Sequence, residues 1–206
     1  MSPDRLAPSY PPLDAPAELL DADDWSLAQA REFLDWTKRV MVPRSDALLA
    51  YLGISPISSS ASPGEHYDML QHVGARVAEV VHDPQFWHHV DRPVHPVYGT
   101  GDYSGPDLND VGLSLAGDVA LLLARVVLTD LSPPLKWGIE RGKTMYNRNL
   151  PILTGFKHRW ADYSPFTYGQ LGTQRLLQHA PPETDYFADR YRRTRSNVLN
   201  PDDKGG

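Results

Sequence analysis

The segment from Asp107 to Thr129 constrains the fold most, because it is long, strongly apolar and helical in its period. Large apolar side chains recur along it at helical spacing, and small ones recur every four residues: Leu108, Val111, Leu115, Val119, Leu122 and Val126, and Gly112, Ala116, Ala120 and Ala124. A stripe of small residues lets a neighbouring helix approach closely. After the first two turns, Asp118 and Arg125 are the only charged residues. The sequence therefore predicts a central helix that other helices surround.

Two helices are predicted before residue 55. Ser26 and Gln29 have the spacing of a capping box, and apolar residues at helical spacing extend the first helix to about Met41. A second, short helix is predicted to follow Pro43, since proline suits the first turn of a helix. It is predicted to end at Gly53, because glycine readily adopts the left-handed conformation at a helix C-terminus.

Later segments also carry helical patterns. Ser62, followed by Pro63, has the chemistry of a helix start, and valines and leucines at helical spacing follow it. Ser164 and the proline after it predict another helix, which ends near His179. The segment 185–197 is predicted to be a short helix or a tail.

The pattern changes between residues 135 and 153. Leu135, Trp137 and Ile139 alternate with polar residues, which indicates a β-hairpin whose second strand contains Pro151 near its end or at an edge. Upstream, residues 84–90 are predicted to form one or two helical turns after a capping aspartate. Residues 97–106 are rich in glycine and are predicted to be a loop.

These elements predict a mainly α protein with a small β-hairpin, an α+β fold with a single helical domain. Residues 1–22 are rich in proline, alanine and aspartate without periodicity, and are predicted to be a disordered, flexible N-terminal arm. Residues 23–183 are predicted to form the globular domain, with the hairpin near 135–153. Residues 184–206 are predicted to be a basic helix or tail.

Composition narrows the classes of function. The 206 residues include no cysteine, which excludes disulfides, thiolate metal sites and a cysteine nucleophile. The formal net charge of -6 argues against sequence-independent binding of nucleic acid, which needs a basic surface. We find no apolar run of membrane-spanning length and no signal-peptide pattern at the N-terminus, so a cytoplasmic protein with no membrane partner is expected. No cofactor motif is found, and no cofactor is expected.

The stretch FWHHVDRPVH, residues 86–95, is the densest group of metal-ligand residue types. His89 and Asp91, with a distant histidine, would resemble the two-histidine, one-carboxylate site of non-haem iron oxygenases, but that site normally lies in a β-barrel. His88 and His89 are adjacent, and neighbours on a helix diverge by about 100°. The alternative is that these histidines are solvated side chains in a connector between two prolines.

Ser114 lies in a motif that resembles the nucleophile elbow of α/β-hydrolases, Gly-x-Ser-x-Ala, and Asp162 and His179 follow in the chain order of a triad. That elbow requires a buried strand that leads into the serine. The preceding residues, GPDLND, have the chemistry of a turn and a helix cap instead. The simpler interpretation is that Ser114 is an ordinary residue of the central helix.

Charge is distributed unevenly along the chain. Acidic residues dominate the first 35 positions, among them Asp21, Asp23 and Asp24. Four arginines cluster near the other end with tyrosines and a phenylalanine between them, and they include Arg190, Arg192 and Arg193. These two groups could contact a basic and an acidic partner respectively, or pair with each other as solvated ends.

The stretch LKWGIERGKTMYNRNLPILTGF, with the helix before it, resembles small bacterial proteins in which a helix with small residues runs into a Trp-bearing strand and then an Asn-x-x-Pro strand. Some of these proteins act as immunity or regulatory partners of toxins. The resemblance covers about a quarter of the chain and includes no catalytic motif. It implies a partner protein and transfers no functional residues.

We therefore expect a non-enzymatic, cytoplasmic protein-binding protein, of the immunity or regulatory kind, that acts by occlusion or scaffolding and is compatible with a homo-oligomer. The expected contacts are the acidic residues above, the three arginines, and the aromatic residues Trp87 and Tyr103, because aromatic anchors typically dominate binding energy at interfaces. The alternative is a small enzyme, either a serine hydrolase that uses Ser114 or a metalloenzyme that uses His88, His89 and Asp91.

Overall fold

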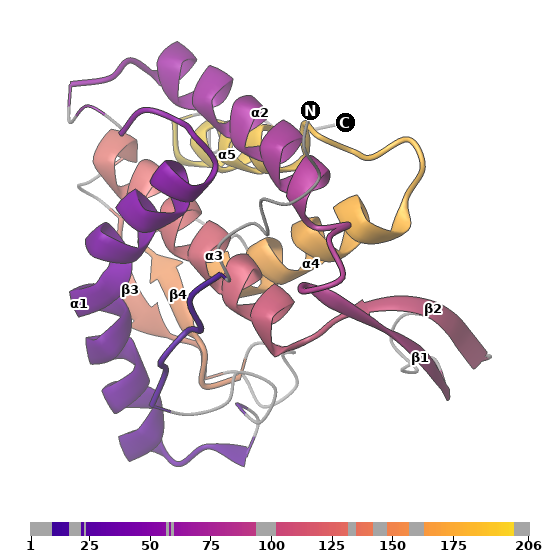
Figure 1. The fold of residues 1–206 in the computed structure, drawn as a ribbon. Helices are drawn as coiled ribbons and strands as arrows, with labels where there is room; N and C mark the ends of the chain where they lie inside the picture. Colours follow the sequence, from indigo (N-terminus) through magenta and orange to yellow (C-terminus); the bar gives the residue numbers. More distant parts are fainter. Residues whose placement is uncertain are drawn as a thin grey trace.

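The computed structural model describes residues 10–16, 22, 24–56, 58, 60–93, 102–131, 135–141, 148–156 and 163–199. Within these residues the chain forms five helices and two antiparallel hairpins, shown in Figure 1. In chain order the elements are α1 (Leu27–Tyr51), α2 (Pro63–Val80), β1 (Trp87–Pro93), β2 (Asp102–Leu108), α3 (Asp110–Leu131), β3 (Lys136–Ile139), β4 (Pro151–Thr154), α4 (Pro165–Gln178) and α5 (Tyr186–Leu199). The predicted class, mainly helical with a hairpin near 135–153, is confirmed.

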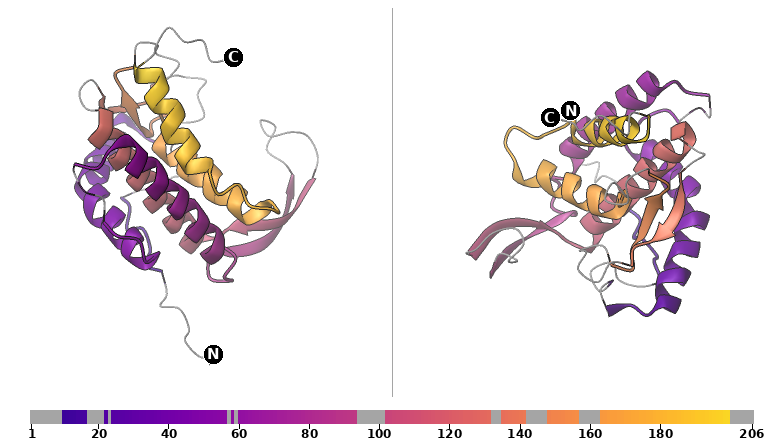
Figure 2. Two further views of the ribbon diagram at one scale, coloured as in Figure 1. Left: turned by 90° about the horizontal axis from the view of Figure 1, so that it is seen from above. Right: turned by 180° about the vertical axis from the view of Figure 1, so that it is seen from behind.

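Helix α3 forms the centre of the fold, as predicted. It packs against α1 on one side and against α4 and α5 on the other, and α2 lies beside α5 (Figure 2). The small-residue stripe is used against α4: a Cβ atom at Gly169 would collide with the Ala116 carbonyl and with Ala120. Small residues on both helices therefore allow their backbones to approach closely.

Helix α3 is also the one described helix long and apolar enough to cross a membrane, which the sequence prediction did not recognise. However, 78% of its most apolar window is buried inside the fold. The core helix of a globular protein and a membrane-spanning helix can share this composition. In this fold the neighbouring helices cover α3.

Helix α1 departs from prediction because it continues through Pro43, where two helices were expected. Its predicted start is correct, since the Ser26 and Gln29 side chains form the reciprocal capping box. Proline inside a helix typically costs about 3 kcal/mol. Buried residues on both sides of Pro43, including Phe33 and Leu48, anchor each half of α1 and offset that cost.

The hairpin β1–β2 replaces the helical turns predicted at 84–90 and part of the loop predicted at 97–106. Trp87 pairs with Leu108 at one end and Pro93 with Asp102 at the other. Asn109 joins this hairpin to α3: its side-chain oxygen accepts hydrogen bonds from two amides of the first turn of α3, and its side-chain amide donates to the Gln85 carbonyl. The helix start predicted at Asp83 is wrong, whereas the stretch GPDLND, predicted to have the chemistry of a helix cap, contains the capping residue Asn109.

Part of the predicted flexible arm is packed on the helices. Residues 10–16 lie against α1 and α3, and Tyr10 is buried, with its ring in edge contact with Tyr51 and Phe86. The Leu13 amide donates a hydrogen bond to Ser114 Oγ (2.9 Å). Residues 10–16 of the predicted arm are therefore packed against the helices, while residues 1–9 and 17–21 of it lie outside the described residues.

The contact that holds this segment centres on Asp118, which is buried in α3. Arg44 of α1 donates two hydrogen bonds to its carboxylate (2.7 Å each), and the Tyr10 hydroxyl donates another. The same guanidinium donates to the carbonyl oxygens of Pro11 and Pro12 (3.2 Å each). One buried ion pair thus ties α1, α3 and residues 10–12 together.

Candidate functional site

The most prominent feature outside the helical body is the hairpin β1–β2, which projects away from it (Figures 1 and 2). Its base is fixed, because the amides of Gln174 and Gln178 on α4 donate to the Pro106 carbonyl of β2 (3.2 Å each). Among the described residues, β1 pairs only with β2, so the outer edge of β1 is open. Unpaired strand edges can accept a further strand from another chain.

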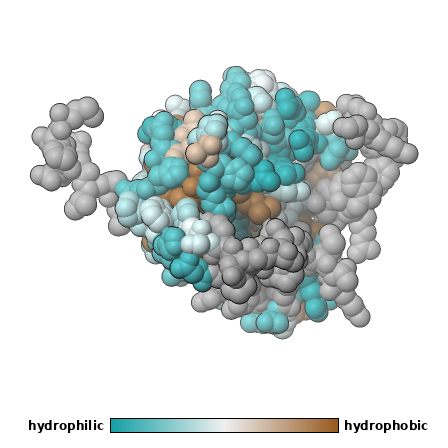
Figure 3. Space-filling model, turned by 90° about the vertical axis from the view of Figure 1, so that its right-hand side faces the viewer, coloured by the Kyte–Doolittle hydropathy of each residue, from teal (hydrophilic) through white to brown (hydrophobic). Residues whose placement is uncertain are grey.

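The face of the molecule from which the hairpin projects is mainly hydrophilic over its described residues, with a smaller hydrophobic area among them (Figure 3). His88, His89, Asp91 and Ser104 are exposed on the strands themselves. The large hydrophobic side chains that are exposed lie on α1 and α5: Leu27, Val42 and Leu199. A partner at the hairpin would therefore meet polar side chains and open backbone groups.

Both aromatic residues predicted to make contacts fall on this hairpin. Trp87 is at its base, half-buried against the main core, and its indole Nε1 donates to the His82 carbonyl (3.2 Å). Tyr103 lies in β2 opposite Arg92 in the strand register. Trp87 therefore anchors the hairpin to the body.

The histidine and aspartate group lies on β1 in a geometry unlike the predicted helical turn. Alternate residues of a strand point to opposite faces, so His88 and His89 cannot bind one ion together. His89 Nε2 lies 3.3 Å from Ser104 Oγ and 3.5 Å from Asp91 Oδ1. A hydrogen bond from Ser104, with a smaller contribution from His89, holds the pKa of Asp91 below its usual value.

This serine, histidine and aspartate group lacks the geometry of a catalytic triad. In a triad the serine and the aspartate contact different ring nitrogens of the histidine, whereas Ser104 and Asp91 both approach Nε2 of His89. The side chains of His89 and Asp91 are 60% and 77% exposed, so water screens them. Within the described ranges, no three histidine, aspartate or glutamate side chains come together to hold a metal ion.

The segment before Ser114 was predicted to be a turn, but residues 105–108 belong to β2, and one residue separates β2 from α3. Ser114 is not at this junction: it is buried in the second turn of α3, four residues after the helix starts at Asp110. Its hydroxyl donates to the Asp110 carbonyl (2.8 Å) and accepts from the Leu13 amide. His179, a proposed triad partner, is instead 3.3 Å from Glu183, and Asp162 lies outside the described residues. Ser114 therefore has a structural position in the contact between α3 and residues 10–16.

The charged candidates do not form a single site. Asp24 is exposed just before α1, while Asp21 and Asp23 lie outside the described residues. On α5, Arg192 pairs with Asp189 (2.9 Å), Arg193 is exposed, and Arg190 stacks on tyrosine rings. In the part of the chain that the structure describes, no ion pair joins Asp24 to these arginines.

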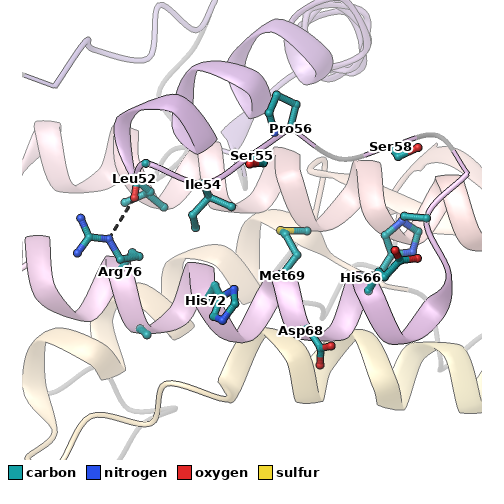
Figure 4. A pocket seen from close by; sticks show the side chains of 14 residues that line it. Leu52, Ile54, Ser55, Pro56, Ser58, His66, Asp68, Met69, His72 and Arg76 are labelled. Atoms are coloured by element: carbon teal, nitrogen blue, oxygen red, sulfur yellow. Dashed lines mark hydrogen bonds between the residues drawn. The ribbon is translucent and has the colours of Figure 1, made fainter.

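Sequence analysis missed a groove between α2 and the segment after α1, shown in Figure 4. Its volume is about 700 Å³, and its lining is apolar at Leu52, Ile54 and Met69. His66 also lines it and is only 1% exposed, and neither ring nitrogen has a hydrogen-bond partner among the described residues. Its imidazole makes an edge contact with the Tyr191 ring, at 6.0 Å between ring centroids.

Burial lowers the pKa of His66, against weaker opposite effects of Asp130 and Glu65. The His66 imidazole therefore binds a proton less readily in the folded state than in the unfolded chain. Above the unfolded pKa of about 6.5 His66 does not reduce the free energy of unfolding, and below it the free energy of unfolding falls because the unfolded chain takes up the proton first. We expect His66→Leu to remove this part of the decline. Urea titrations at a series of pH values from 8 to 5 would give the free energy of unfolding of the wild type and of the variant. The same fall in that free energy with pH for both proteins would contradict the prediction.

The comparisons with known proteins add no family or relative. No family model matches the sequence, and searches of curated proteins and of solved structures find no similar protein. Function must therefore be argued from the site itself.

Proposed function

We propose that this chain is a non-enzymatic, cytoplasmic protein-binding protein that presents the hairpin β1–β2 to a partner protein. The observation that carries the proposal is the hairpin itself, a pair of seven-residue strands that extends from the helical body and that, within the described ranges, pairs with no third strand. Two isolated strands are at best marginally stable in water, so a projecting hairpin gains from a surface that covers it.

In this proposal the chain acts by occluding or scaffolding its partner, as immunity or regulatory proteins do. The base of the hairpin is fixed by Gln174, Gln178, Asn109 and Trp87, so its orientation is set before a partner arrives. A fixed orientation reduces the conformational entropy that the hairpin loses when it binds a partner. The open edge of β1 offers backbone hydrogen bonds, and His89 and Asp91 offer polar contacts for specificity.

A charge reversal on the hairpin tests this proposal. Asp91→Arg is expected to weaken partner binding by about tenfold or more, because it places a like charge against a surface complementary to Asp91. The partner would be captured with the tagged wild-type protein from its own cells, identified by mass spectrometry, purified, and titrated calorimetrically against each variant.

Asp35→Arg is the matched control, because Asp35 is also an exposed aspartate, 67% exposed on α1, in a weak surface ion pair with Lys38 (3.7 Å). It should bind like the wild type. Both variants should fold normally, since exposed ion pairs contribute little to stability. Equal affinity of the Asp91 variant and the wild type would refute the hairpin as the contact surface.

A further inference from the structure

A second feature, where α4 meets α5, is independent of the hairpin. Arg190 lies with its guanidinium carbon 4.7 Å from the ring centre of Tyr168 and 5.1 Å from that of Tyr186. The ring of Tyr163 lies 4.9 Å from that of Tyr168. We call these four residues the arginine–tyrosine site.

Hydrogen-bond donors in this site lack acceptors. Among the described residues, no acceptor takes a hydrogen bond from the buried hydroxyls of Tyr163 and Tyr186, and these residues are only 3% and 8% exposed. A buried polar group without a partner typically costs about 1–3 kcal/mol, and such groups are few in folded proteins. Burial raises the pKa of both phenols, against a smaller lowering by Arg190, so both hydroxyls keep their protons.

Arg190 also differs from the other arginines of α5. Arg192 pairs with Asp189 (2.9 Å) and Arg195 with Asp130 (3.0 Å). Among the described residues, no carboxylate lies within ion-pair distance of Arg190, whose contacts are the two tyrosine rings. In the described part of the chain, a guanidinium without a carboxylate lies beside two hydroxyls without an acceptor, and together they are a set of donors that lacks a negatively charged acceptor.

A surface hollow of about 540 Å³ reaches two of the four residues of this site, Arg190 and Tyr186. Tyr186, Arg190 and Arg193 line it, and so do Arg175 and residues 182–185 at the start of α5. The positive end of the α5 dipole lies at the same place and adds to the attraction for an anion.

The acidic residues in the same hollow accept hydrogen bonds from other side chains, but in the described chain only Glu183 and Asp189 are paired with cations. Glu183 accepts a hydrogen bond from Arg175 (2.9 Å), and Asp189 accepts one from Arg192. Asp185 accepts one from an amide of α2, Gln71 (3.0 Å). Within the described chain, the cations of the hollow left without a carboxylate are Arg190 and Arg193.

We infer that the arginine–tyrosine site binds an oxyanion, a carboxylate or phosphate group, which would accept hydrogen bonds from Arg190 and the Tyr186 hydroxyl. Guanidinium groups recognise both kinds of oxyanion, and hydrogen bonds to charged groups are about twice as strong as those between neutral groups. Neither the hairpin nor its partner takes part, so this site can exist if the proposed function is wrong.

Titration of the full chain with inorganic phosphate, and separately with acetate, tests the site at constant ionic strength by amide NMR shifts. Saturable shifts around residues 182–190 are expected with at least one anion, and the anion that binds more tightly identifies the preferred group. Arg190→Gln should weaken that binding by about tenfold, since a charge-assisted hydrogen bond is typically worth 1.5–3 kcal/mol. Arg192→Gln is the control, because Arg192 lies on the same helix and is already paired. It should change the dissociation constant for the anion by less than about twofold.

Tyr186→Phe separates binding from folding. The Tyr186 hydroxyl donates to no acceptor among the described residues, so its removal should leave the melting temperature in anion-free buffer unchanged or raise it, while anion binding weakens. A lower melting temperature with unchanged anion binding would show that the hydroxyl is structural and overturn the inference. The absence of saturable shifts with both anions, or equal effects of the Arg190 and Arg192 variants, would also overturn it.

Discussion

Asp118→Asn is expected to destabilise the protein by about 3–5 kcal/mol, the usual cost of removing one partner from a buried ion pair. Asp118 is only 1% exposed and accepts both guanidinium hydrogen bonds from Arg44, whose side chain is 19% exposed. Asparagine has nearly the same shape but no charge, so the arginine would stay inside the fold without a counter-charge. The midpoint and slope of urea unfolding give the free energy of unfolding for each protein.

Asp46→Asn is the matched control, since Asp46 also accepts from an arginine across α1 and α3, Arg125 (2.6 Å), but is 45% exposed. It should cost less than about 1 kcal/mol, because water screens exposed pairs. The Asp118 variant should also release residues 10–16, which would appear as faster proteolysis near Tyr10. Equal stability of the two variants would mean that Asp118 does not hold this junction together.

The second large effect is expected at Gly74, where α2 meets the segment between α4 and α5. A Cβ atom there would collide with the backbone carbonyl of Thr184, which cannot move aside as a flexible side chain can. Gly74→Ala is expected to cost about 1–3 kcal/mol, as other overpacked sites do, by pushing α2 away from this segment. Thermal unfolding followed by circular dichroism would measure the loss.

Gly64→Ala in the same helix is expected to have the opposite sign. The nearest atom to a Cβ atom at Gly64 is Ser62 Oγ at 4.0 Å, so alanine fits. Alanine favours the helix over glycine by up to about 1 kcal/mol. If both alanine variants shifted the melting temperature in the same direction, the close packing of α2 described above would be incorrect.

Local chemistry predicted much of the fold. The starts at Ser26 and Ser62 follow from capping boxes, the start of α4 follows from Pro165 in its first turn, and α3 follows from apolar spacing; short windows of sequence contain all of these signals. Pro43 was misjudged because packing along the whole of α1 offsets a local cost. Strand β1 was misjudged because its partner β2 lies mostly within the Gly-rich stretch 97–106, which was predicted to be a loop, and because Asp83 before Pro84 looks like a helix start.

The candidate sites were less predictable, because they depend on contacts across the chain. Trp87 and Asp91 were singled out for their side chains, but the hairpin that presents them comes from long-range pairing. Arg190 was placed in a basic cluster, yet one of the two tyrosine rings it stacks on, Tyr168, comes from α4, and Tyr163 packs against that ring from a third segment. Tyr10 gave no signal in sequence, since its contact with Asp118 spans 108 positions.

The most direct test of the central claim is site-specific photo-crosslinking in the cells that make this protein. A photoreactive residue at position 89 on the hairpin, with position 35 on α1 as control, would be activated by light and the adducts resolved by mass. A single discrete adduct with another protein from position 89, absent from position 35, is the result we predict. No adduct at position 89, an adduct with a second copy of this chain alone, or the same adducts from both positions would contradict the proposal.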